Sequence, residues 1–469
     1  MKHFGLLGEH LSHSYSKIIH QYIFKEIGLD ADYRLIECQE QELKDWIDQI
    51  RQGKFSGFNV TIPYKKKIMD YLDIIDEKAL KIGSVNTVYL LNGKVHGTNT
   101  DYDGFLETIK KYQIDVWQKD CYILGTGGAS LAIVQVLKDL GGICYTVSRT
   151  PDETQISYQD LQKKSIDILV NTTPVGMYPN VLASPVSLEI SKKAKVVMDI
   201  IFNPHQTKLL KDAESNMNGL YMLLIQAIRA EEIWQGINLM IYADEILKKL
   251  KFLLELPKEI FDIVKDLNFN KDQIGCSEDS VYLFENQYIL KISSDLKLLK
   301  REKERVDWLS DKILGSKSVA YVETDRAYYL RTMIHGDSLS AKRFLDNPLL
   351  LIKTIKKVIE VLRGLDQYHC PYHSTDSLGN YFVHGDLCLP NIFVDQQNNF
   401  CGFIDLDNAG VGDVWYDYAW LLWSFEYNLK TNHYNNLLLE NLGLIMDEQS
   451  YLKYIPAENI ARLKEDKEE

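Results

Sequence analysis

Short apolar runs alternate with amphipathic helical patterns through the first hundred residues. Residues 4–7 and 33–36 have the length and composition of strands, whereas stretches 17–27 and 43–50 repeat apolar positions at helical spacing. This alternation predicts an α/β layer structure. The chain should therefore begin with helices packed on a sheet.

A tight hairpin is predicted at Asn92-Gly93, which separates two further apolar runs. A two-residue loop joins antiparallel strands, so the first sheet should be mixed rather than wholly parallel. We assign this mixed α/β domain to residues 1–103.

A second α/β unit begins at residues 121–124. This apolar run breaks into Gly-Thr-Gly-Gly-Ala-Ser at 125–130, a helical pattern continues to about residue 140, and another apolar run follows at 144–147. Strand, glycine turn, helix and strand form a βαβ unit of the Rossmann type. We expect this domain to span residues 104–250, with its last helices packing back on the first domain.

The pattern changes again near residues 251–257. Strand-like runs then cluster between residues 281 and 333, and helical patterns follow from about residue 349. The third region, residues 255–469, is therefore expected to hold a small mixed lobe followed by a helical lobe.

Composition places the chain among soluble globular proteins. Of its 469 residues, 45% are hydrophobic and 25% are charged, which fits neither a disordered nor a fibrous chain. The formal net charge of −13 disfavours nucleic acid and anionic membranes as partners, because both require a basic face. A small anionic substrate would need a local basic pocket.

Seven scattered cysteines without a C-x-x-C pair argue against a disulfide framework and against a zinc cluster. The amino terminus enters a strand pattern with no signal segment, and no apolar run reaches membrane-spanning length. We therefore expect a cytoplasmic protein that is a monomer or a homodimer.

Gly125 and Gly127 stand between a strand and a helix, where peptide N–H groups and the helix amino terminus can hold a pyrophosphate. Ser130 replaces the third glycine of the dinucleotide motif, so a plain glycine turn is an equal alternative on these residues alone. The Ser-Arg-Thr run around Arg149 occupies the position where an acid would hold the ribose of NAD. Arg149 could instead grip a 2′-phosphate, which favours NADP, or it is an ordinary exposed strand-end arginine.

Three polar segments of the first half could hold a small anionic substrate. Ser14 and Ser16 follow the first strand, where they could bind a carboxylate or simply cap a helix. Lys65 follows a proline that is expected to start a helix with three lysines in its first turn. Cations oppose the helix dipole there, so one lysine directed at a substrate explains them better than a solvated face. Asp101 precedes a helix expected from about Gly104, and it is either the cap of that helix or the carboxylate that orients a proton-exchanging lysine.

Together these segments resemble the shikimate dehydrogenase family over residues 1 to about 250. Eight blocks follow one another in family order, namely S-H-S-Y-S, N-V-T-I-P-Y-K, G-S-V-N-T, N-T-D, G-T-G-G-A-S, S-R-T, N-T-T-P-V-G-M and G-L-Y-M-L-L-I-Q. The resemblance implies a shikimate-binding α/β domain followed by an NADP-binding Rossmann-like domain. It also implies the NADPH-dependent, reversible reduction of 3-dehydroshikimate to shikimate, a step of aromatic amino acid biosynthesis.

The resemblance further implies roles for individual residues. Lys65 would carry the proton, with Asp101 beside it, and Ser14 and Ser16 would hold the substrate carboxylate. The ring hydroxyls would contact Asn59, Thr61, Asn86, Asp101 and Gln226. The cofactor would bind Gly125, Thr126, Gly127, Gly128, Ala129, Ser148, Arg149, Thr150 and Thr172, with Gly219 and Met222 flanking the nicotinamide.

Phe202 stands where this family usually has tyrosine, so one hydroxyl contact is lost. The change is expected to weaken substrate binding without removing the chemistry. The Ser-x-Ser pair together with Arg149 resembles the pattern for shikimate, and a quinate/shikimate dehydrogenase is the alternative. A non-catalytic NADP sensor is a further alternative, which the presence of both Lys65 and Asp101 disfavours.

The second half carries the residues of ATP-dependent phosphoryl transfer. Asp386, in a His-Gly-Asp run, would accept a hydroxyl proton, while Asn391 and Asp405 would hold the magnesium that bridges the phosphates. Lys291, in a strand run, and Glu302, in the following helix, suit the phosphate-holding lysine and its partner acid. Taken singly, each of these two would be surface charge.

These residues resemble the aminoglycoside phosphotransferase family, which has a choline kinase-like, bilobal α+β fold of the protein-kinase type, over about residues 255–450. The clearest blocks are H-G-D-L-C-L-P-N-I-F-V, F-I-D-L-D-N-A-G and D-V-W-Y-D-Y-A. The resemblance implies ATP and Mg²⁺ as cofactors, Asp386 as the catalytic base, Asn391 and Asp405 as metal ligands, and a structural role for Asp417.

Two departures limit this second resemblance. The chain between residues 372 and 384 is far shorter than in antibiotic kinases, so the acceptor pocket should differ, and the glycine-rich cover is thin, with only Gly275-Cys276-Ser277. We recognise no ring of carboxylates for a polycationic aminoglycoside. Motivated by the fusion, we hypothesise that this lobe phosphorylates shikimate. The alternative is an inactive pseudokinase or an oligomerisation module attached to a working dehydrogenase.

Overall fold

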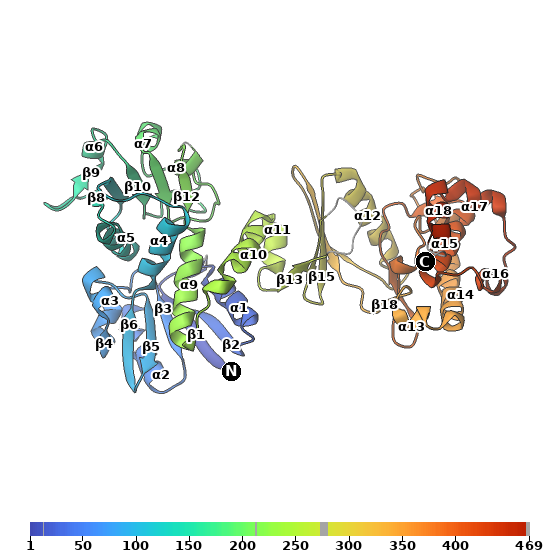
Figure 1. The fold of residues 1–469 in the computed structure, drawn as a ribbon, viewed down its shortest axis with the longest axis horizontal. Helices are drawn as coiled ribbons and strands as arrows, with labels where there is room; N and C mark the ends of the chain where they lie inside the picture. Colours follow the sequence, from blue (N-terminus) through green and yellow to red (C-terminus); the bar gives the residue numbers. More distant parts are fainter. Residues whose placement is uncertain (13, 212, 273–279, 466–469) are drawn as a thin grey trace. The chain divides into compact units, whose positions relative to one another are not determined.

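The computed structural model describes residues 1–12, 14–211, 213–272 and 280–465. It divides into two compact units, Met1–Leu256 and Pro257–Glu469 (Figure 1). The first unit holds two α/β domains, and the division lies within the stretch where the sequence pattern changes.

A mixed six-stranded sheet organises the first α/β domain, with strands in the order β2-β1-β3-β5-β6-β4. The strands are β1 Lys2–Gly8, β2 Ala31–Glu37, β3 Gly57–Val60, β4 Ile74–Ile75, β5 Thr87–Leu91 and β6 Lys94–Thr98. β1 pairs in parallel with β2 and β3, whereas β5 pairs antiparallel with β3 and β6. The predicted hairpin is confirmed, because Asn92 and Gly93 link β5 to β6 with positive φ angles of 52° and 74°.

Helices α1 (Ser16–Glu26), α2 (Leu43–Arg51) and α3 (Glu77–Ile82) accompany this sheet. Ile47 and Ile50 of α2 are fully buried in one core cluster with Phe58 of β3 and Val88 of β5. Each such aliphatic side chain contributes roughly 1.5–3 kcal/mol when buried. Packing of the apolar face, rather than helix propensity, therefore stabilises this short helix.

The second sheet is parallel throughout, in the order β12-β11-β10-β7-β8-β9. Its elements are β7 Asp120–Leu124, α5 Gly128–Asp139, β8 Ile143–Ser148, β9 Ile156–Ser157, α6 Tyr158–Leu161, β10 Ile168–Asn171, α7 Leu188–Lys193, β11 Val196–Asp199, α8 Lys208–Lys211 and β12 Asn216–Asn218. The order proceeds outward from β7 on both sides, as in the Rossmann fold. The glycine turn follows β7, at the crevice where such sheets bind ligands.

Two long helices connect the sheets. α4 (Thr100–Lys111) leads from the first sheet to the second, α9 (Leu220–Gln235) returns, and the two pack along each other (Figure 1). After the 3-10 helix η3 (Met240–Tyr242), α10 (Ala243–Glu255) packs on α1 and α9. The last helices of this unit therefore lie against the first domain.

Helix α4 begins earlier than predicted. It starts at Thr100 rather than near Gly104, because the Asn99 side chain accepts a hydrogen bond from the Tyr102 N–H and caps the helix. The expectation that Asp101 could be the cap is therefore wrong, and its carboxylate is available for another partner.

The predicted helix after Pro63 is also wrong. Residues 62–66 form turns, and only the short 3-10 helix η2 (Lys67–Tyr71) follows. Lys65 therefore lies in a turn, where its charge opposes no α-helix dipole.

The second unit has a five-stranded antiparallel sheet and a helical region, which confirms the expected small lobe and helical lobe. The sheet order is β13-β14-β15-β17-β16. Its elements are α11 Lys258–Val264, β13 Phe269–Lys271, β14 Ser280–Phe284, β15 Tyr288–Ser293, α12 Leu296–Leu309, β16 Ser318–Glu323 and β17 Ala327–Thr332. The helical region contains β18 Asp337–Ser338, α13 Lys342–Leu345, α14 Pro348–Gly364, β19 Tyr381–Val383, β20 Ile392–Val394, β21 Phe400–Phe403, β22 Gly410–Gly412, α15 Val414–Leu429, α16 Asn435–Leu442, α17 Glu448–Tyr454 and α18 Ala457–Glu465. Within the described residues, no helix has the length and hydropathy to cross a bilayer.

Candidate active sites

Lys65 and Asp101 come together from two different elements of the first unit. Lys65 lies in the turn after β3, which Thr61 opens with a 2.9 Å hydrogen bond from its N–H to the Leu7 carbonyl. Asp101 lies in the first turn of α4, and Lys65 Nζ donates to Asp101 Oδ2. Both side chains are mostly buried. A fixed carboxylate therefore orients the ammonium, which is the arrangement that proton exchange with an alcohol requires.

Asparagines hold the other side of this ion pair. Asn86 donates from Nδ2 to Asp101 Oδ1 at 2.8 Å, and its Oδ1 accepts a 2.7 Å hydrogen bond from the Thr100 N–H. Asn59 donates to the Asn86 carbonyl at 3.3 Å and to Thr87 Oγ1 at 3.1 Å. All of these side chains are buried. The structure thus gathers the two predicted asparagines around the predicted catalytic pair.

The glycine turn of the second domain lies beside Lys65. A Cβ added at Gly128, the first residue of α5, would lie 2.9 Å from Lys65 Cδ. Ser84 Oγ also donates to the Gly128 carbonyl at 3.5 Å. The predicted proton carrier and the predicted phosphate-binding turn are therefore adjacent, although they are far apart in the sequence.

The turn has the geometry of a phosphate-binding loop. Gly125 has a φ of +106°, and a Cβ there would lie 2.9 Å from Thr172 Oγ1, so both conformation and space require glycine. The space around Gly127 is open, which lets a ligand approach its backbone. Ser130, in place of the third glycine, donates to the Gly125 carbonyl at 2.7 Å and closes the turn. Thr172 donates to the Leu124 carbonyl at 2.6 Å and joins the ends of β10 and β7.

The other predicted cofactor residues of this region lie at the same edge of the sheet. Ser148 ends β8, and its hydroxyl accepts a 3.2 Å hydrogen bond from the Thr150 N–H. Arg149 between them is exposed, so its guanidinium is accessible to a phosphate. Thr126 is exposed at the glycine turn, and Ala129 is half-buried in the first turn of α5.

Gly219, Met222 and Gln226 lie at the start of α9. Gly219 caps the helix so close to the end of β11 that a Cβ would lie 1.9 Å from the Ile200 carbonyl oxygen. Met222 and Gln226 are mostly buried. Because α9 packs along α4, these residues and Asp101 belong to neighbouring helices.

Ser14 and Ser16 flank Tyr15 at the start of α1. Ser14 Oγ accepts a 3.3 Å hydrogen bond from the N–H of Ser16, the first residue of α1, as a capping side chain would. The N-cap position itself, however, is occupied by Tyr15 and by neither serine. The Tyr15 ring meets the Phe202 ring edge-on, with centroids 5.1 Å apart. Its hydroxyl accepts a 3.2 Å hydrogen bond from Asn203 Nδ2. Phe202 itself has no hydroxyl, but the ring that it contacts, Tyr15, carries one.

Comparison with known proteins decides the family of this unit. Residues 6–88 match the family model described as the shikimate dehydrogenase substrate binding domain. The protein "Shikimate dehydrogenase (NADP(+))" of Clostridium beijerinckii is 41% identical over 253 residues, which are 51% of this chain and 94% of the relative. The chain belongs to the shikimate dehydrogenase family. A member of the same name from Methanococcus maripaludis is 37% identical over 260 residues, 51% of this chain and 92% of the relative.

Solved structures of shikimate dehydrogenases agree with this assignment. Shikimate dehydrogenase 1 from Peptoclostridium difficile aligns with a TM-score of 0.52 and 39% identity, over 54% of this chain and 99% of that chain. A chorismate mutase/shikimate 5-dehydrogenase fusion protein from Clostridium acetobutylicum gives a TM-score of 0.53 and 39% identity, over 55% and 99%. The dehydrogenase fold thus accounts for about half of the chain.

Two carboxylates hold Lys291 in the second unit. Its Nζ lies 2.9 Å from Glu302 Oε2 and 2.6 Å from Asp405 Oδ1, and Arg331 approaches Glu302 at 3.7 Å. Burial alone would lower the pKa of Lys291, but the two carboxylates outweigh burial and raise the pKa above its usual value. Lys291 therefore stays protonated, and a permanent positive charge suits contact with a phosphate.

Asp405 presents its carboxylate beside Lys291 from an unusual backbone conformation. Its φ is +56°, in the left-handed region that residues other than glycine seldom adopt. Burial would raise the pKa of Asp405, but Lys291 outweighs burial and lowers it. The side chain is 45% exposed, whereas Glu302 is 1% exposed, so Asp405 is the one that a metal ion could reach.

Asp386 and Asn391 form the neighbouring half of this site. Asn391 Nδ2 donates to Asp386 Oδ2 at 2.8 Å. Asp417 accepts hydrogen bonds from the N–H groups of His384 at 2.7 Å and Gly385 at 3.0 Å, and its complete burial raises its pKa to about 7. Asp417 thus shapes the loop that carries Asp386, as a structural residue would. The Ile404 N–H, next to Asp405, donates to the Asn391 carbonyl at 3.0 Å and joins the two halves.

Residues 376–442 match the family model described as the phosphotransferase enzyme family. The match includes the predicted base and both predicted metal ligands, while Lys291 and Glu302 lie upstream of it. The second unit therefore contains a region that is similar to the phosphotransferase enzyme family. The predicted glycine-rich cover, residues 275–277, lies outside the described residues.

The short connection before β19 places a further carboxylate in this region. Asp376 accepts hydrogen bonds from Asn408 Nδ2 at 2.7 Å and from the Tyr416 hydroxyl at 3.3 Å. Burial raises the pKa of Tyr416, and the negative charges of Asp376 and Asp386 add to this shift. Sequence reasoning missed Asp376 because its position depends on how the short connection folds back towards Asn408.

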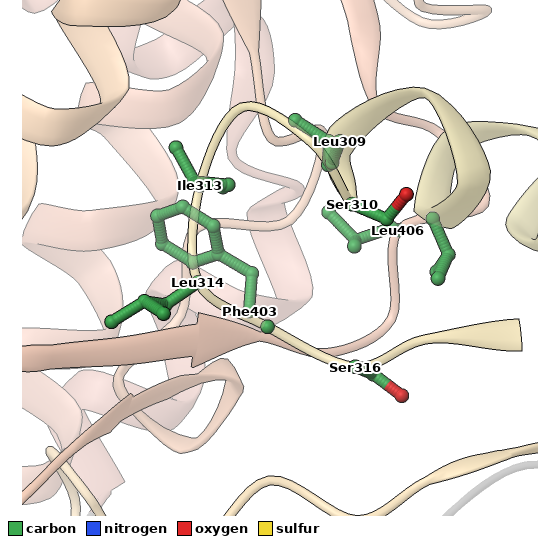
Figure 2. A pocket seen from close by; sticks show the side chains of 9 residues that line it. Leu309, Ser310, Ile313, Leu314, Ser316, Phe403 and Leu406 are labelled. Atoms are coloured by element: carbon green, nitrogen blue, oxygen red, sulfur yellow. The ribbon is translucent and has the colours of Figure 1, made fainter.

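A pocket at the carboxyl end of α12 carries no comparable chemistry (Figure 2). Its walls include Leu309, Ile313, Phe403 and Leu406, with hydroxyls only from Ser310 and Ser316. None of its lining residues is titratable. We therefore interpret it as a feature of packing.

Sequence reasoning also missed the polar residues behind the asparagines of the first unit. Tyr33 donates to Asn59 Oδ1 at 2.7 Å, and Asn99 donates to the Ser84 carbonyl at 2.9 Å. Tyr33 lies in an apolar strand pattern and reads as a core residue. The only signal in the sequence was that Ser, Asn and Thr are frequent in residues 84–87 and 98–100, more than is usual for a buried region.

Proposed function

We propose that Met1–Leu256 catalyses the reversible, NADPH-dependent reduction of 3-dehydroshikimate to shikimate. The observation that carries this proposal is the buried Lys65–Asp101 pair beside the glycine turn. The names of the relatives, each a shikimate dehydrogenase (NADP(+)), support the same reaction.

The proposed mechanism uses the lysine as the proton carrier. Lys65 Nζ donates a proton to the carbonyl oxygen of 3-dehydroshikimate during reduction and recovers it when shikimate is oxidised. Asp101 keeps the amine in place and balances its charge. The glycine turn would hold NADPH, whose chemistry when bound is to provide the hydride. The positive φ of Gly125 and the open space at Gly127 fit its pyrophosphate.

We further propose that the polar side chains around the pair select the substrate. Ser14 and Ser16 hold its carboxylate, and Asn59, Thr61, Asn86 and Gln226 contact its ring hydroxyls. Arg149 is exposed where the cofactor ribose lies in this fold, and no carboxylate stands in its Ser-Arg-Thr run, which supports NADP over NAD.

An assay of the full chain with matched substrates tests this proposal. NADPH with 3-dehydroshikimate, and NADP with shikimate, should both turn over. NAD(H) should be poorer by at least about tenfold, the effect of one lost charged hydrogen bond, and quinate should be a poorer substrate than shikimate. Turnover with quinate equal to that with shikimate would support the broader quinate/shikimate dehydrogenase instead. Absence of turnover with either acid would overturn the proposal.

We also propose that Pro257–Glu469 is an ATP-dependent phosphotransferase. Asp386 accepts the proton of an acceptor hydroxyl, Asn391 and Asp405 hold Mg²⁺, and Lys291, fixed by Glu302, contacts the phosphates. Activity over a pseudokinase is supported by three contacts, which join Lys291 to Glu302, Lys291 to Asp405 and Asn391 to Asp386.

Shikimate is the acceptor that the fusion suggests, because the first unit would produce it. Asp376 lies in the same region as Asp386, and two carboxylates would repel an anionic acceptor. This observation favours an uncharged or cationic alcohol as the second candidate.

Phosphoryl transfer by the full chain separates these readings. With ATP and Mg²⁺, a shikimate kinase should form shikimate phosphate, and Asp386→Asn should lower the rate by about 10²–10⁴-fold, as for a lost general base. Asp346→Asn, an exposed aspartate at the end of α13, is the matched control. Transfer only to uncharged or cationic alcohols would replace shikimate as the acceptor. Mg²⁺-dependent ATP binding without transfer to any alcohol would indicate a pseudokinase.

A further inference from the structure

Tyr33 is buried behind the proposed substrate site. It lies on β2 with 1% of its side chain exposed, and its hydroxyl donates to Asn59 Oδ1 at 2.7 Å. Its ring stacks on the His20 ring, with centroids 4.0 Å apart and planes 8° apart. His20 is in turn bonded to buried Glu231 at 2.6 Å. The tyrosine hydroxyl is therefore held in one place.

The partners of Asn59 define which way its amide points. Nδ2 faces the Asn86 carbonyl, which can only accept a hydrogen bond, so the amide cannot turn over without placing two oxygens together. The hydroxyl of Tyr33 then supplies the donor that Oδ1 needs. Loss of this donor would leave a buried amide oxygen with one fewer partner.

The same amide belongs to the hydrogen bonds that reach the ion pair. Asn59 Nδ2 donates to Thr87 Oγ1, which donates to Asn86 Oδ1 at 3.0 Å, and Asn86 Nδ2 donates to Asp101 Oδ1. The orientation of Asn59 is thus linked, through two side chains, to the carboxylate that holds Lys65.

We propose that Tyr33 is a positioning residue, which orients Asn59 for a ring hydroxyl of the substrate and steadies Asn86 and Asp101 behind it. This inference rests on the proposed dehydrogenase function. The network orients groups and does not relay protons, because the amide side chains within it do not ionise. Burial raises the pKa of Tyr33 well above its usual value, and the Glu231 charge adds to the shift, so the hydroxyl keeps its proton.

A double-mutant cycle tests the inference in the full chain. Tyr33→Phe should raise KM for 3-dehydroshikimate by about tenfold with a smaller change in kcat, and it should leave the Kd of NADPH unchanged. In an Asn59→Ala background the same change should raise KM no further, because Tyr33 then has no amide to orient. Thr108→Val, which removes another buried hydroxyl bond of the same unit, is the matched control and should leave KM unchanged.

The outcomes separate the inference from the function on which it rests. A KM effect of Tyr33→Phe that persists in the Asn59→Ala background would show a merely structural role and overturn the inference. Wild-type KM in Tyr33→Phe would also overturn it. A wild-type chain that does not turn over 3-dehydroshikimate would instead overturn the proposed function, and the inference with it.

Discussion

Each unit of the chain sets a mostly buried lysine against carboxylates, and the two settings differ. In the first unit, Lys65 meets Asp101, whose other oxygen accepts a hydrogen bond from Asn86. In the second unit, Lys291 meets both Glu302 and Asp405. A second carboxylate near an amine favours the protonated form.

This difference suits the two lysines to different tasks. Burial alone would lower the pKa of Lys291, but its two carboxylates raise the pKa above its usual value, so the ammonium keeps its proton. Lys291 would therefore present a permanent positive charge to a phosphate. In the proposed reaction Lys65 must release and recover a proton, and its single carboxylate orients it for that exchange. The proposed phosphate holder therefore has two carboxylates beside its amine, whereas the proposed proton carrier has one.

The largest effect is expected from removal of Lys65, the proposed proton carrier. Lys65→Ala should lower kcat for 3-dehydroshikimate reduction by about 10²–10⁴-fold, the usual contribution of a general acid, with the Kd of NADPH nearly unchanged. Steady-state kinetics and cofactor titration measure the two quantities. Lys66→Ala, an exposed neighbour, is the control and should retain the wild-type rate. An equal loss of NADPH affinity in Lys65→Ala would show that this lysine holds the cofactor, as Lys291 is proposed to do.

Removal of Lys291, the proposed phosphate holder, should lower the stability of the second unit as well as its nucleotide binding. Lys291→Met leaves the 1% exposed Glu302 without its main cation, with Arg331 only at 3.7 Å. Breaking a buried pair in this way costs about 3 kcal/mol. The second unit should therefore unfold at a lower temperature and lose Mg²⁺-ATP binding, as calorimetry with and without nucleotide can show. Unchanged unfolding would contradict the charge arrangement, and dehydrogenase activity should persist in either case.

The architecture of both units was predictable from local pattern, because apolar periodicity reflects burial. Residues 4–7 and 121–124 lie within observed strands, and Lys291 lies in β15 as its apolar surroundings predicted. The hairpin at Asn92-Gly93 follows from its turn residues. The edge strands β13 and β16 were not predicted. β13 has three residues, of which two are polar, and therefore shows no alternation.

The candidate sites were predictable only where motifs name the residue. Lys65 and Asp101 were named by resemblance, but their ion pair depends on a turn and on the start of α4, which Asn99 sets by capping. Tyr33 and Asp376 had no motif. Their roles arise from partners far along the chain, and a local pattern cannot contain such contacts.

The two units also differ at a carboxylate. Asp405 of the second unit forms an ion pair with Lys291, whereas Asp199 of the first unit accepts its hydrogen bonds from neutral groups. Burial raises the pKa of Asp199 to about 6, against which the donors Ile201, Thr207 and Asn171 act only partly. A pKa raised on folding means that this site stabilises the fold below about pH 4 and loses that contribution as pH rises through about 6. Relative to wild type, Asp199→Asn should therefore become more stable between pH 4 and 7, by at most about 3 kcal/mol.

The hydrogen bonds of Asp199 can be kept when asparagine replaces it. Oδ1 accepts from both Ile201 N and Asn171 Nδ2, and Oδ2 accepts from the Thr207 hydroxyl, which can rotate to accept from an amide instead. Urea unfolding across the pH range measures the difference. Asp160→Asn is the control of opposite sign, because a hydrogen bond from Ser157 lowers the pKa of the Asp160 carboxyl. A flat difference for Asp199→Asn would show that the three donors offset the effect of burial on Asp199 completely.

The smallest effect is expected from substitution of Arg149, an exposed arginine of the first unit. Arg149 lies at the surface after β8, where water competes for its guanidinium, whereas Lys291 meets its partners in a mostly buried site. Arg149→Ala should weaken NADPH about tenfold, the value of one charged hydrogen bond, and should leave NADH unaffected because NADH lacks the 2′-phosphate. The ratio of kcat/KM for the two cofactors measures this preference, with Lys163→Ala as the exposed control. Equal weakening of both cofactors would place Arg149 on the pyrophosphate that they share, and the preference for NADP would then need another residue.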